Sequence, residues 1–235
     1  METNMTCVQV LRTLSVLPLL VVLCVTAHAQ QGTSAVQDGI FAAPQEGGAR
    51  RWVVDNADGL ALLVAPGTAE TVGGVIAQHA VLTNFGCTEA LGALWCDVRP
   101  LHGGPRGYVP ADALSPAKGP DGIVARGVND SVTRARKKRF DITAEVPCAQ
   151  EQGEALAPCP IGIARSDGGD ATAAVTFRNG FSRYLFFMHG AFISASATMS
   201  GAGRDTDWEV RGGTHYIRAD DQQFQIPNAL LFAQE

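Results

Sequence analysis

Short runs of alternating apolar and polar residues, each ending in a turn rich in Gly, Pro, Asn or Asp, fill the chain from residue 51 onward. A two-residue period of this kind is typical of half-buried β-strands. In the first half we predict strands at residues 51–54, 60–64, 75–76, 85–87, 95–98, 107–109 and 113–114. In the second half we predict strands at residues 140–143, 161–163, 171–178, 181–188, 191–197, 208–211, 215–218 and 224–226. No amphipathic helix of three turns is evident in the second half, so the sequence predicts an all-β protein.

Two turn signals support the strand assignment. Ala65-Pro66-Gly67-Thr68 separates two apolar runs, and Pro and Gly each preset a turn conformation of the backbone. Asn179-Gly180 lies between two longer runs and predicts a tight hairpin in which both turn residues take a positive φ.

The N-terminus has the order of features of a secretory signal. Arg12 precedes an apolar stretch, residues 14–26, which ends in Ala27-His28-Ala29. We therefore expect a signal peptide at residues 1–29, cleaved after Ala29. The apolar run is shorter than the ~20 residues of a membrane span, so no membrane span is expected. A lipoprotein cysteine at Cys24 is disfavoured by the bulky Leu23 before it.

The expected export bears on how the cysteines are interpreted. Removal of the signal would leave an even set of four: Cys87, Cys96, Cys148 and Cys159. In an oxidising compartment such a set predicts disulfides. Three pairings are possible, and proximity favours Cys87 with Cys96 and Cys148 with Cys159. The spacings lack the Cys-x-x-Cys form of zinc sites, so no metal is expected.

The stretch from Trp52 to Leu114, with its order of strands, the Pro66-Gly67 turn and a closing Gly107-Tyr108-Val109, resembles the bacterial SH3-like domain of cell-envelope proteins. The resemblance implies a small barrel at residues 49–116 that binds cell-wall peptide or glycan, or an envelope protein. It places the contacts near Pro66, Arg106 and Tyr108. The chain departs from the family at Ala61 and Leu63, where Asn and Arg are usual, and at Tyr108, where Trp is common.

Two polar segments flank this module. Residues 30–48 are rich in Gln, Gly, Ala and Ser and predict a flexible leader. Residues 117–139 predict a basic linker: from Lys118 to Arg139 there are seven basic and two acidic residues, although the whole chain has a net charge of −5. The linker is interpreted as a solvated spacer or as a contact with anionic polymer or lipid. Nucleic acid is disfavoured because the basic residues are not interleaved with aromatic ones.

Residues 140–235 predict a second small antiparallel β domain with one disulfide. This region is similar to a C-terminal domain of proteobacterial secreted proteins that has no assigned activity, and four motifs carry the similarity: Phe140-Asp141, Pro147-Cys148-Ala149-Gln150, Cys159-Pro160-Ile161-Gly162 and Gly168-Gly169-Asp170-Ala171-Thr172.

A catalytic constellation is not evident. None of the histidines after the signal has a two-ligand spacing, and no serine lies in a Gly-x-Ser-x-Gly elbow; the histidines are His79, His102, His189 and His215. Asp167-Gly168-Gly169-Asp170 could approach a ligand with its backbone N–H groups, but its carboxylates would repel phosphate, so we interpret it as a tight turn. A groove for sugar or peptide could be formed by aromatic residues, namely Phe181, Tyr184, Phe186, Phe187 and Phe192.

These patterns favour a non-catalytic, periplasmic or secreted binding protein without a cofactor. Two alternatives stay open. One is a cell-wall enzyme with its chemistry in residues 140–235, which would need a free cysteine, a histidine or paired acids there. The other is a structural or inhibitory interaction protein.

Overall fold

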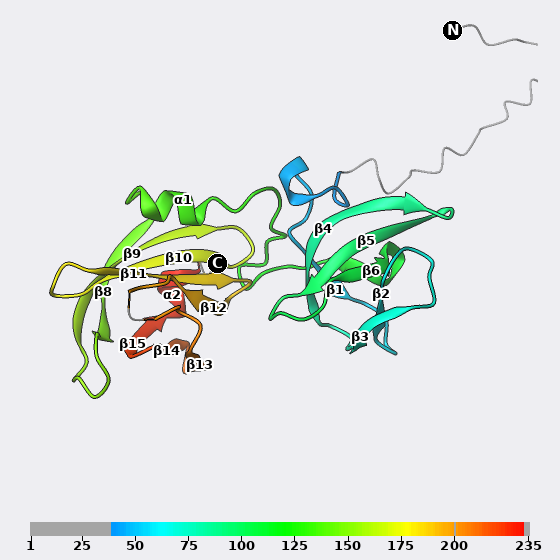
Figure 1. The fold of residues 1–235 in the computed structure, drawn as a ribbon. Helices are drawn as coiled ribbons and strands as arrows, with labels where there is room; N and C mark the ends of the chain where they lie inside the picture. Colours follow the sequence, from blue (N-terminus) through cyan, green and yellow to red (C-terminus); the bar gives the residue numbers. More distant parts are fainter. Residues whose placement is uncertain (1–38, 200, 233–235) are drawn as a thin grey trace, which may run out of the picture. The chain divides into compact units, whose positions relative to one another are not determined.

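Two antiparallel β-sheets contain almost all the regular structure of the computed structural model, which describes residues 39–199 and 201–232 (Figure 1). Strands make up 51% of the described residues and helices 8%, so the predicted all-β class is confirmed. The expected signal peptide, residues 1–29, and residues 30–38 of the expected leader lie outside the described residues. Within the described ranges, no helix has the length and apolar character needed to cross a membrane.

The first sheet has seven strands in the order β3-β2-β6-β5-β4-β1-β7. Their bounds are Arg51–Val54 (β1), Leu60–Leu63 (β2), Thr71–Ile76 (β3), Val81–Ala90 (β4), Ala93–Pro100 (β5), Gly107–Pro110 (β6) and Leu114–Pro116 (β7). Two short 3-10 helices accompany the sheet, Pro44–Glu46 (η2) and Ala111–Ala113 (η3). Every strand predicted in the first half is therefore present, although β3 and β4 are several residues longer than expected.

Residues 39–48, which the sequence assigned to a flexible leader, pack on the first sheet. The ring of Phe41 stacks on that of Trp52, with 5.0 Å between their centroids. Trp52 itself is fully buried and lies in the core with Leu62 and Leu82. The low apolar content of this segment concealed the contact, because only Ile40 and Phe41 of its large apolar side chains pack against the core.

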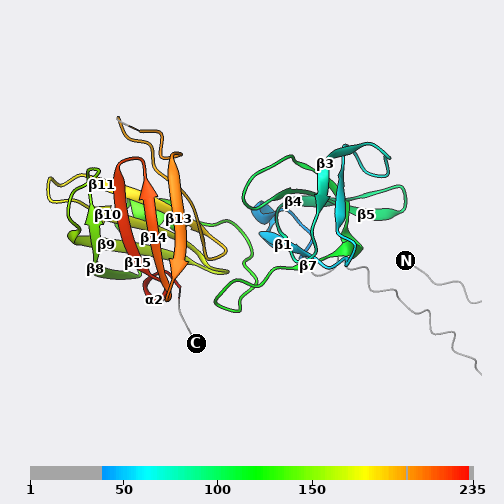
Figure 2. The same ribbon diagram turned by 90° about the horizontal axis from the view of Figure 1, so that it is seen from below.

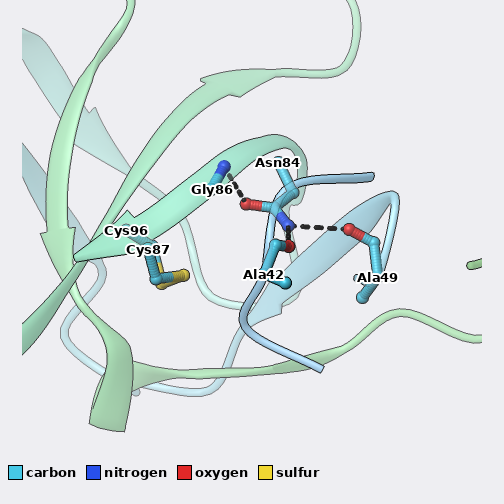
Figure 3. The surroundings of a disulfide bond; sticks show 6 residues. All are labelled: Ala42, Ala49, Asn84, Gly86, Cys87 and Cys96. Atoms are coloured by element: carbon cyan, nitrogen blue, oxygen red, sulfur yellow. Dashed lines mark hydrogen bonds between the residues drawn. A yellow bond between two sulfur atoms is a disulfide. The ribbon is translucent and has the colours of Figure 1, made fainter. Parts of the chain in front are cut away.

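Asn84 also holds residues 39–48 against the first sheet, through hydrogen bonds (Figure 3). Its amide donates to the carbonyls of Ala42 and Ala49, at 3.1 and 2.7 Å, and its carbonyl accepts from Gly86 N–H at 2.8 Å. Asn84 is 2% exposed, so all three bonds replace contacts with water. The predicted disulfide between Cys87 and Cys96 follows directly along β4 and β5.

The basic segment 117–139, expected to be a linker, contains helix α1, Ser131–Arg136, which lies against β9 and β10 of the second sheet (Figure 1). Ala135 of this helix is fully buried. Arg134 pairs with Asp130 and Asp141 at 3.0 and 2.8 Å and donates to the carbonyl of Arg165. The C-terminal part of the segment is thus folded on the second sheet.

The second sheet has eight strands in the order β12-β11-β10-β9-β8-β15-β14-β13. Their bounds are Ile142–Ala149 (β8), Ala157–Ser166 (β9), Asp170–Thr176 (β10), Ser182–Met188 (β11), Ala191–Ala195 (β12), Thr206–Arg211 (β13), Thr214–Ala219 (β14) and Gln222–Pro227 (β15). The strands β13, β14 and β15 stand side by side in Figure 2. A short helix, Asn228–Leu231 (α2), follows β15.

Alternation of side chains builds the core of the second sheet. On β11, Leu185 and Phe187 are buried while the residues between them are half-buried, and on β15 Phe224 and Ile226 repeat the pattern. The predicted disulfide between Cys148 and Cys159 joins β8 to β9 and is part of this core.

The hairpin predicted at Asn179-Gly180 is present between β10 and β11, but its turn differs from the expected one. Only Gly180 has a positive φ, of 82°. The Asn179 side chain instead accepts a hydrogen bond from Phe181 N–H at 3.0 Å, and Phe177 N–H donates to the Phe181 carbonyl. The turn is therefore a three-residue loop, residues 178–180, that ends with Gly180 in the left-handed region. An Asn-Gly pair is compatible with this loop as well as with the expected two-residue turn.

Candidate functional site

The outer face of the first sheet brings together side chains from four neighbouring strands. Asp97 of β5 pairs in register with Tyr108 of β6, and Tyr108 pairs with Leu63 of β2. On β4 the register shifts between Asn84 and Cys87, so Phe85 and Gly86 together lie opposite Asp97. Phe85 lies on the outer face because it follows the buried Asn84 on β4, and successive side chains of a strand point to opposite faces. The bulge places Gly86 beside it opposite Asp97.

Arg106 crosses this face and is held in place by Asp97. Its Nε donates to Oδ1 of Asp97 at 2.7 Å and its Nη2 donates to Oδ2 at 2.6 Å. The guanidinium lies over the Phe85 ring, 4.1 Å from the centroid. The hydrogen bonds to Asp97 raise the pKa of Arg106 above its usual value, so the side chain stays charged. The Arg106 side chain is nevertheless 55% exposed and therefore accessible to a partner.

A second arginine flanks the same aromatic ring. Arg99 lies two residues after Asp97 on β5, and its guanidinium is 5.6 Å from the Phe85 centroid. It is exposed and has no ion-pair partner among the described residues. Two arginines and one aspartate give the face a net charge of +1. We call the five residues Phe85, Asp97, Arg99, Arg106 and Tyr108 the Arg106 face.

The three binding residues named from the sequence are only partly brought together. Arg106 and Tyr108 share the Arg106 face, since Tyr108 lies in register with Asp97, which holds Arg106. Pro66 is half-buried in the turn after β2, and no contact recorded among the described residues joins it to Arg106 or Tyr108. Its neighbour Gly67 instead lies against Leu91 in the turn between β4 and β5. The predicted role of Pro66 in binding stays a prediction.

Sequence reasoning missed Phe85, Asp97 and Arg99. Asp97 and Arg99 alternate with the buried Cys96 and Val98, so a strict two-residue period places both on the solvent side of β5. Phe85 gave no such signal, because the buried residue before it, Asn84, is polar and so does not mark the inner face of β4.

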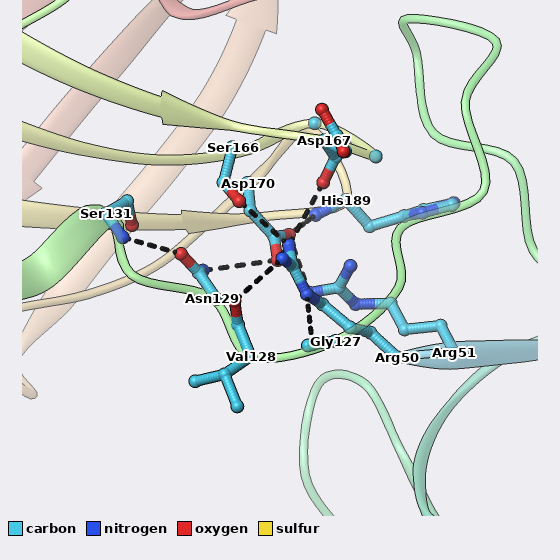
Figure 4. Close-up of polar contacts among 12 residues, drawn as sticks. Arg50, Arg51, Gly127, Val128, Asn129, Ser131, Ser166, Asp167, Asp170 and His189 are labelled. Carbon is cyan, nitrogen blue, oxygen red and sulfur yellow. Dashed lines mark hydrogen bonds and ion pairs between the residues drawn. The ribbon is translucent and has the colours of Figure 1, made fainter. Parts of the chain in front are cut away.

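The most buried carboxylate of the second sheet belongs to Asp170, at the start of β10 (Figure 4). Its side chain is 0% exposed and accepts from Arg50 at 3.1 Å and from Arg51 at 2.6 Å. It also accepts from the amide of Asn129 at 3.2 Å and from His189 N–H at 3.0 Å. Arg50 immediately precedes β1 and Arg51 begins it, so this cluster joins the first sheet to the second. All four bonds are internal, which makes it a structural junction.

The loop 167–170 is a tight turn, as its sequence predicted. Gly168 and Gly169 have φ values of 73° and 74°. Their N–H groups donate to Oδ2 of Asp121, at 2.7 and 3.3 Å, and are therefore used within the protein.

Two histidines of the second sheet have lowered pKa values. Burial lowers the pKa of His215, which is 1% exposed, and Trp208 Nε1 donates to its Nδ1 at 2.8 Å. Burial and the nearby Arg51 lower the pKa of His189, which follows the end of β11. Both histidines are thereby favoured in the neutral form. Neither has a nucleophile at hydrogen-bonding distance among the contacts recorded for the described residues.

Four of the remaining candidates of the second sheet are used in its core, and Tyr184 is not. Cys148 and Cys159 are joined in a disulfide, so neither offers a thiolate. Phe187 and Phe192 pack edge to face inside, with ring centroids 5.8 Å apart. Tyr184 points to the other face of the sheet, where it lines a shallow groove with Phe140. Among the residues that the structure describes, no three His, Cys, Asp or Glu side chains are grouped to hold a metal ion.

Two disulfides are typical of proteins that work outside the cytoplasm, in an oxidising compartment. Comparison of the chain with protein-family models, with curated proteins and with solved structures finds no match, so the chemistry of the site is argued from its own geometry.

Proposed function

We propose that this protein is a non-catalytic, exported binding protein of the cell envelope, periplasmic or secreted, and that its SH3-like module recognises cell-wall peptide. The Arg106 face is the binding surface.

The observation that carries the proposal is the way in which Arg106 is presented. An exposed arginine normally samples many rotamers, and binding must immobilise it at a cost of about 0.5–1.5 kcal/mol. Here two hydrogen bonds to Asp97 and the Phe85 ring already fix the guanidinium on an open face. Preorganisation of this kind favours binding without adding contacts.

The charge of the face indicates the group that it binds. Asp97 offsets one of the two arginines, and Arg99 is left with an unopposed charge beside the aromatic ring. A carboxylate on an extended peptide would accept from Arg99 while the peptide lies across Phe85 and Tyr108. Peptide stems of the cell wall carry such carboxylates.

Sedimentation of the full chain with purified peptidoglycan tests the proposal. We expect retention at low salt, and a loss of affinity of about tenfold or more in Arg99→Ala, since charge-assisted hydrogen bonds contribute about 1.5–3 kcal/mol each. The matched control is Arg178→Ala, which removes an exposed arginine from the turn between β10 and β11.

A soluble stem peptide with its carboxylates amidated should bind more weakly than the unmodified peptide. The proposal fails if peptidoglycan does not retain the protein at low salt, or if Arg99→Ala and Arg178→Ala bind equally.

A further inference from the structure

The second sheet contains a polar cavity of about 410 Å³ that has no part in the Arg106 face. It lies where β11, the start of the loop between β8 and β9, and the turn between β14 and β15 come together. A cavity of this volume is within the range of small-molecule sites. Arg183 enters it from the core side of β11, because it lies on the same face of the strand as the buried Leu185 and Phe187 and is itself 0% exposed.

Two residues that line the cavity each have a buried side-chain atom with no hydrogen-bond partner among the described residues. One is the Nε of Arg183, whose Nη2 donates to Oδ2 of Asp220 at 2.6 Å. The other is the Oε1 of Gln222, a residue that is 9% exposed. Buried polar groups in proteins are nearly always hydrogen-bonded. The wall therefore offers one donor and one acceptor, and a ligand hydroxyl can satisfy either, since it both donates and accepts.

The charges around the cavity exclude an anion. One arginine faces three carboxylates, those of Glu151, Asp220 and Asp221, so the lining has a net charge of −2. Asp220 already neutralises Arg183, and an anionic group at Arg183 Nε would lie beside this carboxylate. Glu151 and Asp221 are exposed and have no recorded ion-pair partner in the described part of the chain. They favour a cationic group on the ligand.

We infer that this cavity binds an amino sugar: a ligand of monosaccharide size with hydroxyls for Arg183 and Gln222 and an ammonium group for Glu151 and Asp221. The inference does not depend on the function proposed for the Arg106 face. It gives the second sheet a binding site of its own, for a free sugar or for a sugar unit at the end of a chain.

NMR titration of the full chain with glucosamine, glucose and gluconate tests this assignment. Glucosamine should produce saturable shifts of the backbone amides of Asp221 and Gln222 at millimolar concentrations. Glucose, which lacks the ammonium group, should bind more weakly. Gluconate should not bind, because its carboxylate meets the acidic lining.

Two variants separate the contribution of the acidic side chains to binding from that of Gln222. The double substitution Glu151→Gln and Asp221→Asn changes only exposed side chains and should weaken glucosamine binding about tenfold without changing glucose binding. Gln222→Met removes the buried acceptor and should weaken both sugars, provided that its thermal midpoint shows a folded protein. Arg106→Ala should leave glucosamine binding unchanged, which separates this site from the Arg106 face.

The inference is overturned if glucosamine gives no saturable shift, if gluconate binds as well as glucosamine, or if the double variant binds glucosamine like the parent chain. In the first of these cases the two buried atoms would be satisfied by ordered water alone.

Discussion

Two aspartates of this protein meet arginines in opposite surroundings. Asp97 holds Arg106 on an open face, where the arginine is 55% exposed, and Asp170 holds Arg50 and Arg51 at a junction where its own side chain is 0% exposed. The chemistry of the contact is the same in both places. Exposure decides its use, because an exposed ion pair adds little stability and keeps its donors accessible, whereas a buried one cannot lose a partner without leaving a desolvated charge.

The largest effect on stability is expected for Asp170→Ala, which tests the buried ion pair. The change leaves Arg50 and Arg51 buried without their carboxylate, and we expect a loss of about 3–5 kcal/mol in the free energy of unfolding. Urea unfolding of the full chain measures it. Asp167→Ala is the matched control, since only the backbone carbonyl of this exposed residue contacts Arg50. A loss below about 1 kcal/mol in Asp170→Ala would show that the junction is not a buried ion pair in solution.

Much of the fold follows from the sequence because its strands obey local rules. The two-residue period is visible wherever one face of a strand is buried, and Cys87 and Cys96 are close enough along the chain for proximity to indicate their bridge. The hairpin at Asn179-Gly180 was located correctly for the same reason. The geometry of its turn differs from the prediction, because the Asn179 side chain accepts a hydrogen bond from the Phe181 backbone N–H and Asn179 needs no positive φ.

The rest depends on contacts between distant residues, which leave no local pattern. Asp170 accepts from Arg50, 120 residues away, and nothing in the neighbourhood of either residue indicates the other. The basic segment is a similar case: Arg134 donates to the carbonyl of Arg165, 31 residues away, and the sequence around Arg134 shows only one charge in a basic run. On the Arg106 face, the register that sets Asp97 against Tyr108 is fixed by the sheet as a whole.

A second test extends the comparison of buried and exposed groups to the histidines. Burial lowers the pKa of His215 below its ordinary value of 6.5, so between these two values the unfolded chain binds more protons than the folded protein. Stability is therefore complete above about pH 7 and falls as the pH is lowered, with a slope of at most about 1.4 kcal/mol per pH unit for this proton. Urea unfolding at a series of pH values between about 7.5 and 5 measures the slope.

His215→Gln keeps an acceptor for Trp208 and should reduce the slope, leaving the contribution of His189, whose pKa is shifted in the same direction. His79→Gln, at an exposed position, should leave the slope unchanged. An identical acid dependence in His215→Gln and the parent chain would show that this histidine is not buried in its neutral form.

The smallest effect on stability is expected for Asp97→Asn, and it separates two explanations of binding by the Arg106 face. The substitution should change the free energy of unfolding by less than about 1 kcal/mol, because the pair is exposed.

Asp97→Asn also removes a negative charge, so the net charge of the Arg106 face rises by one. If general attraction to an anionic polymer drove binding, the variant would bind peptidoglycan more tightly, as would Asp112→Asn, which adds the same charge at an exposed position on η3. We expect the opposite, a loss of affinity of several-fold in Asp97→Asn alone, because Arg106 then loses the carboxylate that orients it over Phe85. Peptidoglycan sedimentation of both variants at low and moderate salt makes the measurement, and tighter binding by Asp97→Asn would refute preorganisation as the basis of recognition.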